Sequence, residues 1–86
     1  MDAEPIVYML VIVYTGPLDP KIDEAIEKCL KKEHSEQGYI ISRRKRDLVF
    51  DYDSSVAAGA AGERLKIAFP FLDIQGVYSS DELEKL

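Results

Sequence analysis

The chain opens with an unbroken apolar stretch. Nine residues, Ile6–Tyr14, are aliphatic or aromatic and mostly β-branched, and Pro5 and Gly16-Pro17 bound them. This composition predicts a strand, because β-branched and aromatic side chains favour strands and proline interrupts them. The apolar residues are consecutive rather than alternate, so both faces of the strand should be covered. We expect this strand in the centre of a sheet.

The spacing of apolar residues then changes to that of a helix. Asp19 is a suitable N-cap, and Pro20 suits the first helical position, where an N–H is not needed. Glu24 and Lys28, four residues apart, have the favourable order for an ion pair on an outer face. The expected inner face consists of Ile22, Ala25, Ile26, Cys29 and Leu30.

Two further strands are predicted in the middle of the chain. They cover Tyr39–Arg43 and Leu48–Tyr52, and the polar tip Arg44–Asp47 joins them as a hairpin. In the second of these strands, alternation separates Leu48, Phe50 and Tyr52 from Val49. We expect the first group to face the helices and Val49 to face away from them.

A second helix and a last strand complete the predicted pattern. Asp53 or Ser54 can cap the helix, which should end near Phe69 because Pro70 follows. Residues Asp73–Tyr78 predict the fourth strand, and Ser79 has capping-box spacing to Glu82 for a short C-terminal helix. The expected inner face of the second helix is Ala57, Ala61, Leu65, Ala68 and Phe69.

The order of elements predicts the fold. A chain of 86 residues fits a single domain, 1–86, since a second core would be too small. The order strand-helix-strand-strand-helix-strand, with right-handed crossovers and a central first strand, predicts a ferredoxin-like α+β sandwich. Its four-stranded antiparallel sheet should have the order 4-1-3-2, with both helices on one face.

Charge and cysteine content narrow the classes of partner. The net charge is −5, which argues against broad binding to nucleic acid or to anionic membranes. The single cysteine excludes an intramolecular disulfide. The apolar run is about half the length of a membrane span, and the residues before it are acidic. We therefore expect a cytoplasmic protein without a membrane partner.

The sheet face away from the helices is the first candidate site. One alternating set of the first strand must point to that face, either Val7, Met9, Val11 and Val13 or the set that contains the tyrosines. We favour the tyrosine set, because hydroxyls tolerate a wet interface. The predicted homodimer interface is then Tyr8, Leu10, Ile12, Tyr14 and Val49. The alternatives are coverage by the C-terminal residues Leu83 and Leu86, by Lys or Arg stems, or by an unidentified protein partner.

The second candidate is a basic cluster at the hairpin, formed by Arg43, Arg44, Lys45 and Arg46. It could contact an anion or a nucleic acid, or it could be a solvated tip that discourages edge pairing. RNA-recognition domains share the predicted topology, but their third-strand motif needs a glycine and a second small residue. The segment Arg46–Tyr52 lacks both, so this resemblance is one of topology only. We favour the solvated tip, because the chain is acidic and nucleic-acid binders normally spread basic charge across a face.

No catalytic, metal or cofactor motif is visible. His34 lies in a polar stretch after the first helix, and Cys29 falls on the apolar face of that helix. Gly59-Ala60-Ala61-Gly62 contains no cation, which favours close helix packing over phosphate binding. The sequence therefore predicts a non-enzymatic interaction or regulatory module. The alternatives are a nucleic-acid-binding module and a small enzyme with an unrecognised carboxylate and histidine site.

Overall fold

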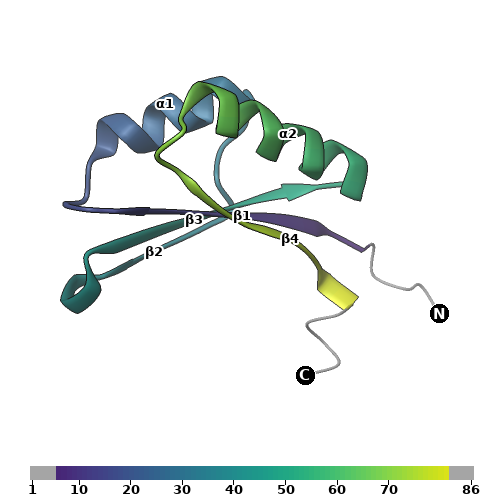
Figure 1. Ribbon diagram of the computed structural model, residues 1–86. Coiled ribbons are helices and arrows are strands. Elements are labelled where there is room, and N and C mark those ends of the chain that lie inside the picture. The colour runs from purple at the N-terminus through teal and green to yellow at the C-terminus, as the bar shows by residue number, and fades with distance from the viewer. Residues whose placement is uncertain (1–5, 82–86) are drawn as a thin grey trace.

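The structure is a computed structural model, and it describes residues 6–81. Its strands and helices follow the predicted order, strand-helix-strand-strand-helix-strand (Figure 1). In chain order they are β1 (Tyr8–Thr15), α1 (Pro20–Leu30), β2 (Glu36–Ile40), the 3-10 turn η1 (Ile41–Arg43), β3 (Lys45–Tyr52), α2 (Ser55–Ala68) and β4 (Asp73–Ser79). The predicted C-terminal helix, with Leu83 and Leu86, falls mainly on residues 82–86, outside the described part.

The four strands form one antiparallel sheet. Their order is β2-β3-β1-β4, which is the expected 4-1-3-2 read from the opposite edge. Both helices cover the same face of the sheet, and the other face carries no element of the described chain (Figure 1). The fold is therefore an α+β structure of two layers, with β1 in the interior of the sheet as its apolar sequence indicated.

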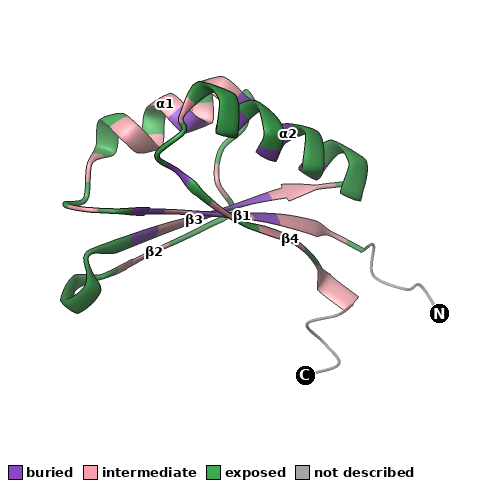
Figure 2. Cartoon of the chain, viewed as in Figure 1, coloured by how far each residue is buried: buried purple, intermediate pink, exposed green. Residues whose placement is uncertain are grey.

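The core lies between the sheet and the helices. Alternate residues of β1 and β3 face the helices and are almost fully buried, and Figure 2 shows separate buried segments on the strands and on the helices. Register explains why they meet, since Leu10 lies opposite Phe50 and Ile12 opposite Leu48. The core cluster contains Leu10, Ile12, Tyr14, Ile26, Leu30, Leu48, Phe50, Ala61, Leu65 and Leu72.

The helices begin where the sequence indicated. The Asp19 side chain accepts a hydrogen bond from the Lys21 backbone, and Ser54 caps α2 by accepting one from Ala57. The predicted inner face of α2 is partly wrong, because Ala57 and Ala68 are exposed. Its buried residues are Ala58, Ala61, Gly62 and Leu65.

Gly62 explains the close approach of α2 to the sheet. A Cβ atom at this position would lie 3.3 Å from Leu10 Cδ1 and 3.5 Å from Ile74 Cγ2. Gly59, one turn earlier, would place its Cβ in open space. The packing interpretation of the two-glycine segment therefore holds at Gly62 only.

The favoured orientation of β1 is wrong. Leu10, Ile12 and Tyr14 face the helices, and Tyr8 belongs to the same alternation. The tyrosine hydroxyl that we expected to need water finds protein partners instead. Tyr14 Oη donates to Asp23 Oδ1 at 2.9 Å and lies 3.3 Å from the Asp19 carbonyl oxygen. A buried tyrosine with such partners is stable in a core.

The hairpin also differs from the prediction. β2 ends at Ile40, and the turn η1 occupies residues that the sequence predicts as strand. Arg44 closes that turn in the left-handed region, with φ of 52°. β3 therefore begins at Lys45, three residues earlier than expected, and this shift brings Arg46 into the sheet.

Candidate interaction surface on the open face of the sheet

The open face of the sheet carries the second alternating set of β1. Met9, Val11 and Val13 point away from the helices, and the register sets Val11 beside Val49. We call the apolar residues that line this face the open-face patch. They are Met9, Val11, Val13, Ile40, Val49 and Tyr78.

Two shallow hollows run along the open-face patch and share Val11 as a common wall. One, of about 230 Å³, is lined by apolar side chains and by Glu36. The other, of about 320 Å³, extends toward Ile40, Lys45 and Asp47. Val49 is only 8% exposed even though no helix covers it, because neighbouring side chains surround it. Tyr78 and Ile40, at 41% and 48%, are the most accessible apolar side chains of the patch.

Charged residues surround the open-face patch. Alternation along β3 puts Lys45, Asp47 and Asp51 on the open face, with Val49 between the two aspartates. Glu36 of β2 lies opposite Val49, and Asp73 of β4 lies opposite Val13. Acidic side chains therefore outnumber basic ones on this face, with Lys45 as the cation among the described strand residues that face this way.

The predicted self-association residues are therefore split between two faces. Val49 lies on the open face as expected, whereas Leu10, Ile12 and Tyr14 are at most 3% exposed and cannot contact a partner there. The presence of tyrosine was the wrong criterion for choosing between the two alternating sets of β1. Met9, Val11 and Val13 of β1, which line the open face, belong to the other set that the sequence left open.

The basic hairpin does not present four cations. Arg46 lies on the helix side of β3, and its guanidinium donates to Asp23 Oδ2 at 2.8 Å. It also donates to the Gly38 carbonyl oxygen and to Gln37 Oε1. Arg43, Arg44 and Lys45 remain exposed. Arg46 is thus committed to an internal ion pair and is wrong as an anion or nucleic-acid contact.

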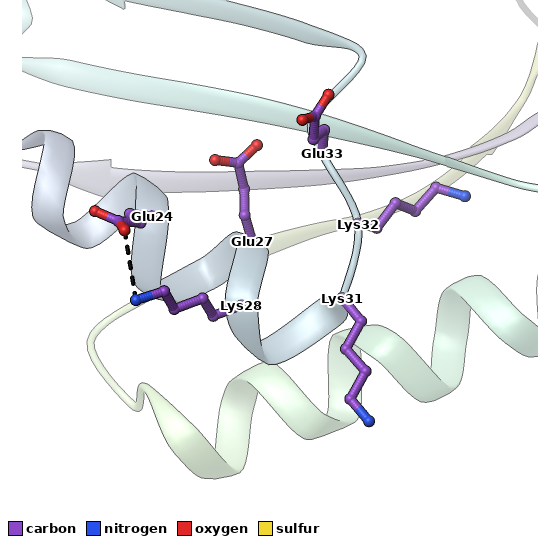
Figure 3. Close-up of a pocket in the computed structure, with 6 residues that line it drawn as sticks. All are labelled: Glu24, Glu27, Lys28, Lys31, Lys32 and Glu33. Atoms are coloured by element: carbon purple, nitrogen blue, oxygen red, sulfur yellow. Dashed lines mark ion pairs between the residues drawn. The ribbon is translucent and has the colours of Figure 1, made fainter.

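A third hollow, of about 400 Å³, lies at the C-terminal end of α1. Figure 3 shows Lys28, Lys31 and Lys32 extending in different directions, while Glu27 and Glu33 lie away from Lys31. An anion site needs donors that converge, and these side chains diverge. The hollow is therefore a mixed-charge surface, in which Lys28 pairs with Glu24 at 3.4 Å.

His34 and Cys29, the residues considered for catalysis, have different surroundings. His34 Nδ1 is 3.1 Å from Glu27 Oε2, which also accepts from the His34 backbone N–H. Cys29 is half-buried and packs against the core from α1. Within residues 6–81 no group of three or more His, Cys, Asp and Glu side chains could hold a metal ion. None of the helices in that range is long and apolar enough to cross a membrane.

No family model, curated protein or solved structure matches the chain.

Proposed function

We propose that this chain is a non-enzymatic protein-interaction module that forms a homodimer through the open face of its sheet. We also propose that its arrangement is ferredoxin-like, on the basis of the strand order and the helices on one face. The observation that carries the functional proposal is the open-face patch, which has contributions from all four strands and no covering element among residues 6–81.

The physical reason for association is burial of apolar surface. Antiparallel sheets tolerate water on one face when that face alternates to polar residues. Here the β1 positions on the open face are Met9, Val11 and Val13, so the centre of the sheet does not alternate. Removing such a patch from water yields about 25 cal/mol per Å². A second sheet packed at about 10 Å would cover it.

The edges of the sheet are less suited to association than its face. β2 has only five residues, and short edge strands resist pairing with another chain. The register of β4 on β1 shifts between Val11 and Ile12, beside Gly76 with φ of 135°. Such bulges twist an edge and hinder the addition of a further strand. The face is thus the larger and more regular surface.

The proposal is tested by placing one charge on each face of the molecule. Val11→Glu puts a carboxylate in the middle of the open-face patch. Val56→Glu makes the same change on α2, where Val56 is 81% exposed on the opposite side of the molecule. We expect light scattering after size exclusion to give a dimer for the wild type and Val56→Glu, and a monomer for Val11→Glu.

Two results would contradict the proposal. A wild-type protein that is monomeric at high concentration would exclude the homodimer. If Val56→Glu were the monomeric variant, the copies would instead meet through α2. Circular dichroism of each variant shows whether the fold is retained.

A further inference from the structure

The charges of the open face are arranged along β3 in a way that suits a second copy in one orientation. Lys45 and Asp51 lie on the same side of this strand, six residues apart. At 3.3–3.4 Å per residue they are separated by about 20 Å. Leu48, which faces the helices, is the midpoint between them, and it lies opposite Ile12 of β1. One positive and one negative group are thus placed symmetrically about the centre of the sheet.

Two apolar residues of β1 are symmetrical about the same centre. Ile12 separates Val11 from Val13, and both of these point to the open face. A two-fold axis that crosses the strands at this level would bring Val11 of one copy to Val13 of the other. The same rotation would bring Lys45 of one copy to Asp51 of the other. Each contact occurs twice, as two-fold symmetry requires.

The alternative two-fold axis, parallel to the strands between β1 and β3, gives a poorer match. It would place Asp51 of one copy over Met9 of the other, so that a carboxylate is covered by an apolar side chain. Lys45 would then lie over Thr15, which offers no negative charge. Desolvating a charged group without a partner is costly. Charge complementarity therefore favours the axis that crosses the strands.

Asp47 does not distinguish the two axes. It would face a valine of the other copy in either arrangement, Val49 with the crossing axis and Val13 with the parallel one. Its carboxylate leans across Gly38 of β2, where a Cβ atom would lie 2.6 Å from Asp47 Oδ1. The charge is thus directed toward the edge of the sheet rather than toward the docked copy. The choice of axis depends on Lys45 and Asp51.

Both members of the pair are available for contact. Lys45 is exposed, and its flexible four-carbon stem can span much of the roughly 10 Å between packed sheets. Asp51 is half-buried, and Ser35 Oγ donates to its Oδ1 at 2.9 Å, which holds the carboxylate in place. Arg46, the next cation along β3, faces the helices and cannot substitute for Lys45.

We propose that the second copy docks with its two-fold axis across the strands, between the levels of Val11 and Val13, so that Lys45 of each copy pairs with Asp51 of the other. This inference rests on the proposed homodimer and specifies its register. The apolar contact supplies most of the affinity, and the two ion pairs select the orientation.

A charge-swap experiment tests the register. Lys45→Glu alone sets a glutamate against Asp51 twice in the dimer, and Asp51→Lys alone sets two lysines together twice. We expect each variant to dimerise at least about tenfold more weakly than the wild type. In an equimolar mixture of the two variants, the mixed dimer has two attractive contacts, one between the new glutamate and the new lysine and one between the unchanged Lys45 and Asp51. A contact is attractive whenever its two charges have opposite signs. Lys45→Glu/Asp51→Lys, which reverses both charges in every copy, should therefore dimerise within about threefold of the wild-type dissociation constant.

Sedimentation velocity gives the dissociation constants, and circular dichroism shows whether each variant retains the fold. If Asp51→Lys fails to fold, and the double variant fails with it, Lys45→Glu alone still tests the weakening. A wild-type dimer that neither single change weakens would overturn the register and leave the proposed function intact. So would a double variant that shows no recovery. A monomeric wild type would overturn both.

Discussion

The buried ion pair between α1 and β3 gives the sharpest prediction about stability. The side chains of Arg46 and Asp23 are only 7% and 13% exposed, and their charged atoms are 2.8 Å apart. Arg46→Met keeps much of the length of the side chain but removes the guanidinium. The Asp23 carboxylate would then keep its hydrogen bond from the Tyr14 hydroxyl and lose its cation.

The size of the effect follows from that geometry. Breaking a buried ion pair by removing one partner costs about 3–5 kcal/mol, because it leaves an uncompensated charge. Asp23 retains some contact with water, so we expect about 2–4 kcal/mol for Arg46→Met. A domain of this length has a total stability of about 4–13 kcal/mol. The melting temperature should therefore fall by at least about 8 °C.

Urea unfolding followed by circular dichroism measures this loss. Arg43→Met is the matched control, because Arg43 belongs to the same basic run but is exposed. It should change the free energy of unfolding by less than about 0.5 kcal/mol. A double-mutant cycle with Asp23→Asn isolates the pair from the other bonds of Arg46. Equal effects of Arg46→Met and Arg43→Met would refute the assignment of Arg46 to the fold.

Further outcomes are expected from the packing of α2 and from the buried tyrosines. Gly59→Ala should raise the free energy of unfolding in a urea titration by about 1 kcal/mol, because its Cβ meets nothing within 4 Å and alanine favours the helix. Gly62→Leu should instead lower the free energy of unfolding, since Leu10 already lies 3.3 Å from the Cβ position. A Gly62→Leu variant more stable than Gly59→Ala would contradict this packing. Tyr52→Phe should leave stability unchanged or raise it by up to about 1 kcal/mol, because the buried Tyr52 hydroxyl has no hydrogen-bond partner in residues 6–81. Tyr14→Phe should instead lower stability by about 1 kcal/mol, because it removes the hydrogen bond to Asp23. Burial raises the pKa of both tyrosines above 10.0, so the folded state holds these protons more tightly than the unfolded state. The resulting stability is full below about pH 10 and is lost as the pH rises through the raised pKa. The free energy of unfolding of Tyr52→Phe should therefore fall less steeply than that of the wild type as the pH rises through this range. An equally steep fall would contradict this.

Local sequence signals predict much of the fold that the structure shows. Helix α1 begins at Pro20 after the Asp19 cap, and its apolar spacing places Ile26 and Leu30 in the core. β1 lies in the interior of the sheet because its residues are apolar on both faces. These features depend on residues close together in the sequence, where capping and periodicity act directly.

The face of β1 could not be predicted in this way. Both alternating sets of β1 are apolar, so hydrophobicity does not distinguish them. The tyrosine set faces the helices because its hydroxyl finds a partner on another element: the Asp23 carboxylate of α1 accepts a hydrogen bond from Tyr14. The general preference of tyrosine for wet interfaces was therefore the wrong guide at this position.

The role of Arg46 did leave a signal in the sequence. Alternation places Arg46 on the same side as Leu48 and Phe50, which the sequence assigns to the core face. A basic residue there needs a buried acid, and Asp23 follows Ile22 near the start of an amphipathic helix. The sequence predicts that this strand begins only at Leu48, so Arg46 falls in the expected tip and the alternation is not extended to it.

The absolute molar mass of the wild-type protein in solution tests the central claim most directly. Light scattering over a dilution series should give twice the chain mass of 9.7 kDa at high concentration and approach 9.7 kDa on dilution. That result would establish a reversible homodimer, for which Val11→Glu identifies the face and the charge swap the register. A mass of 9.7 kDa at every concentration would contradict the account.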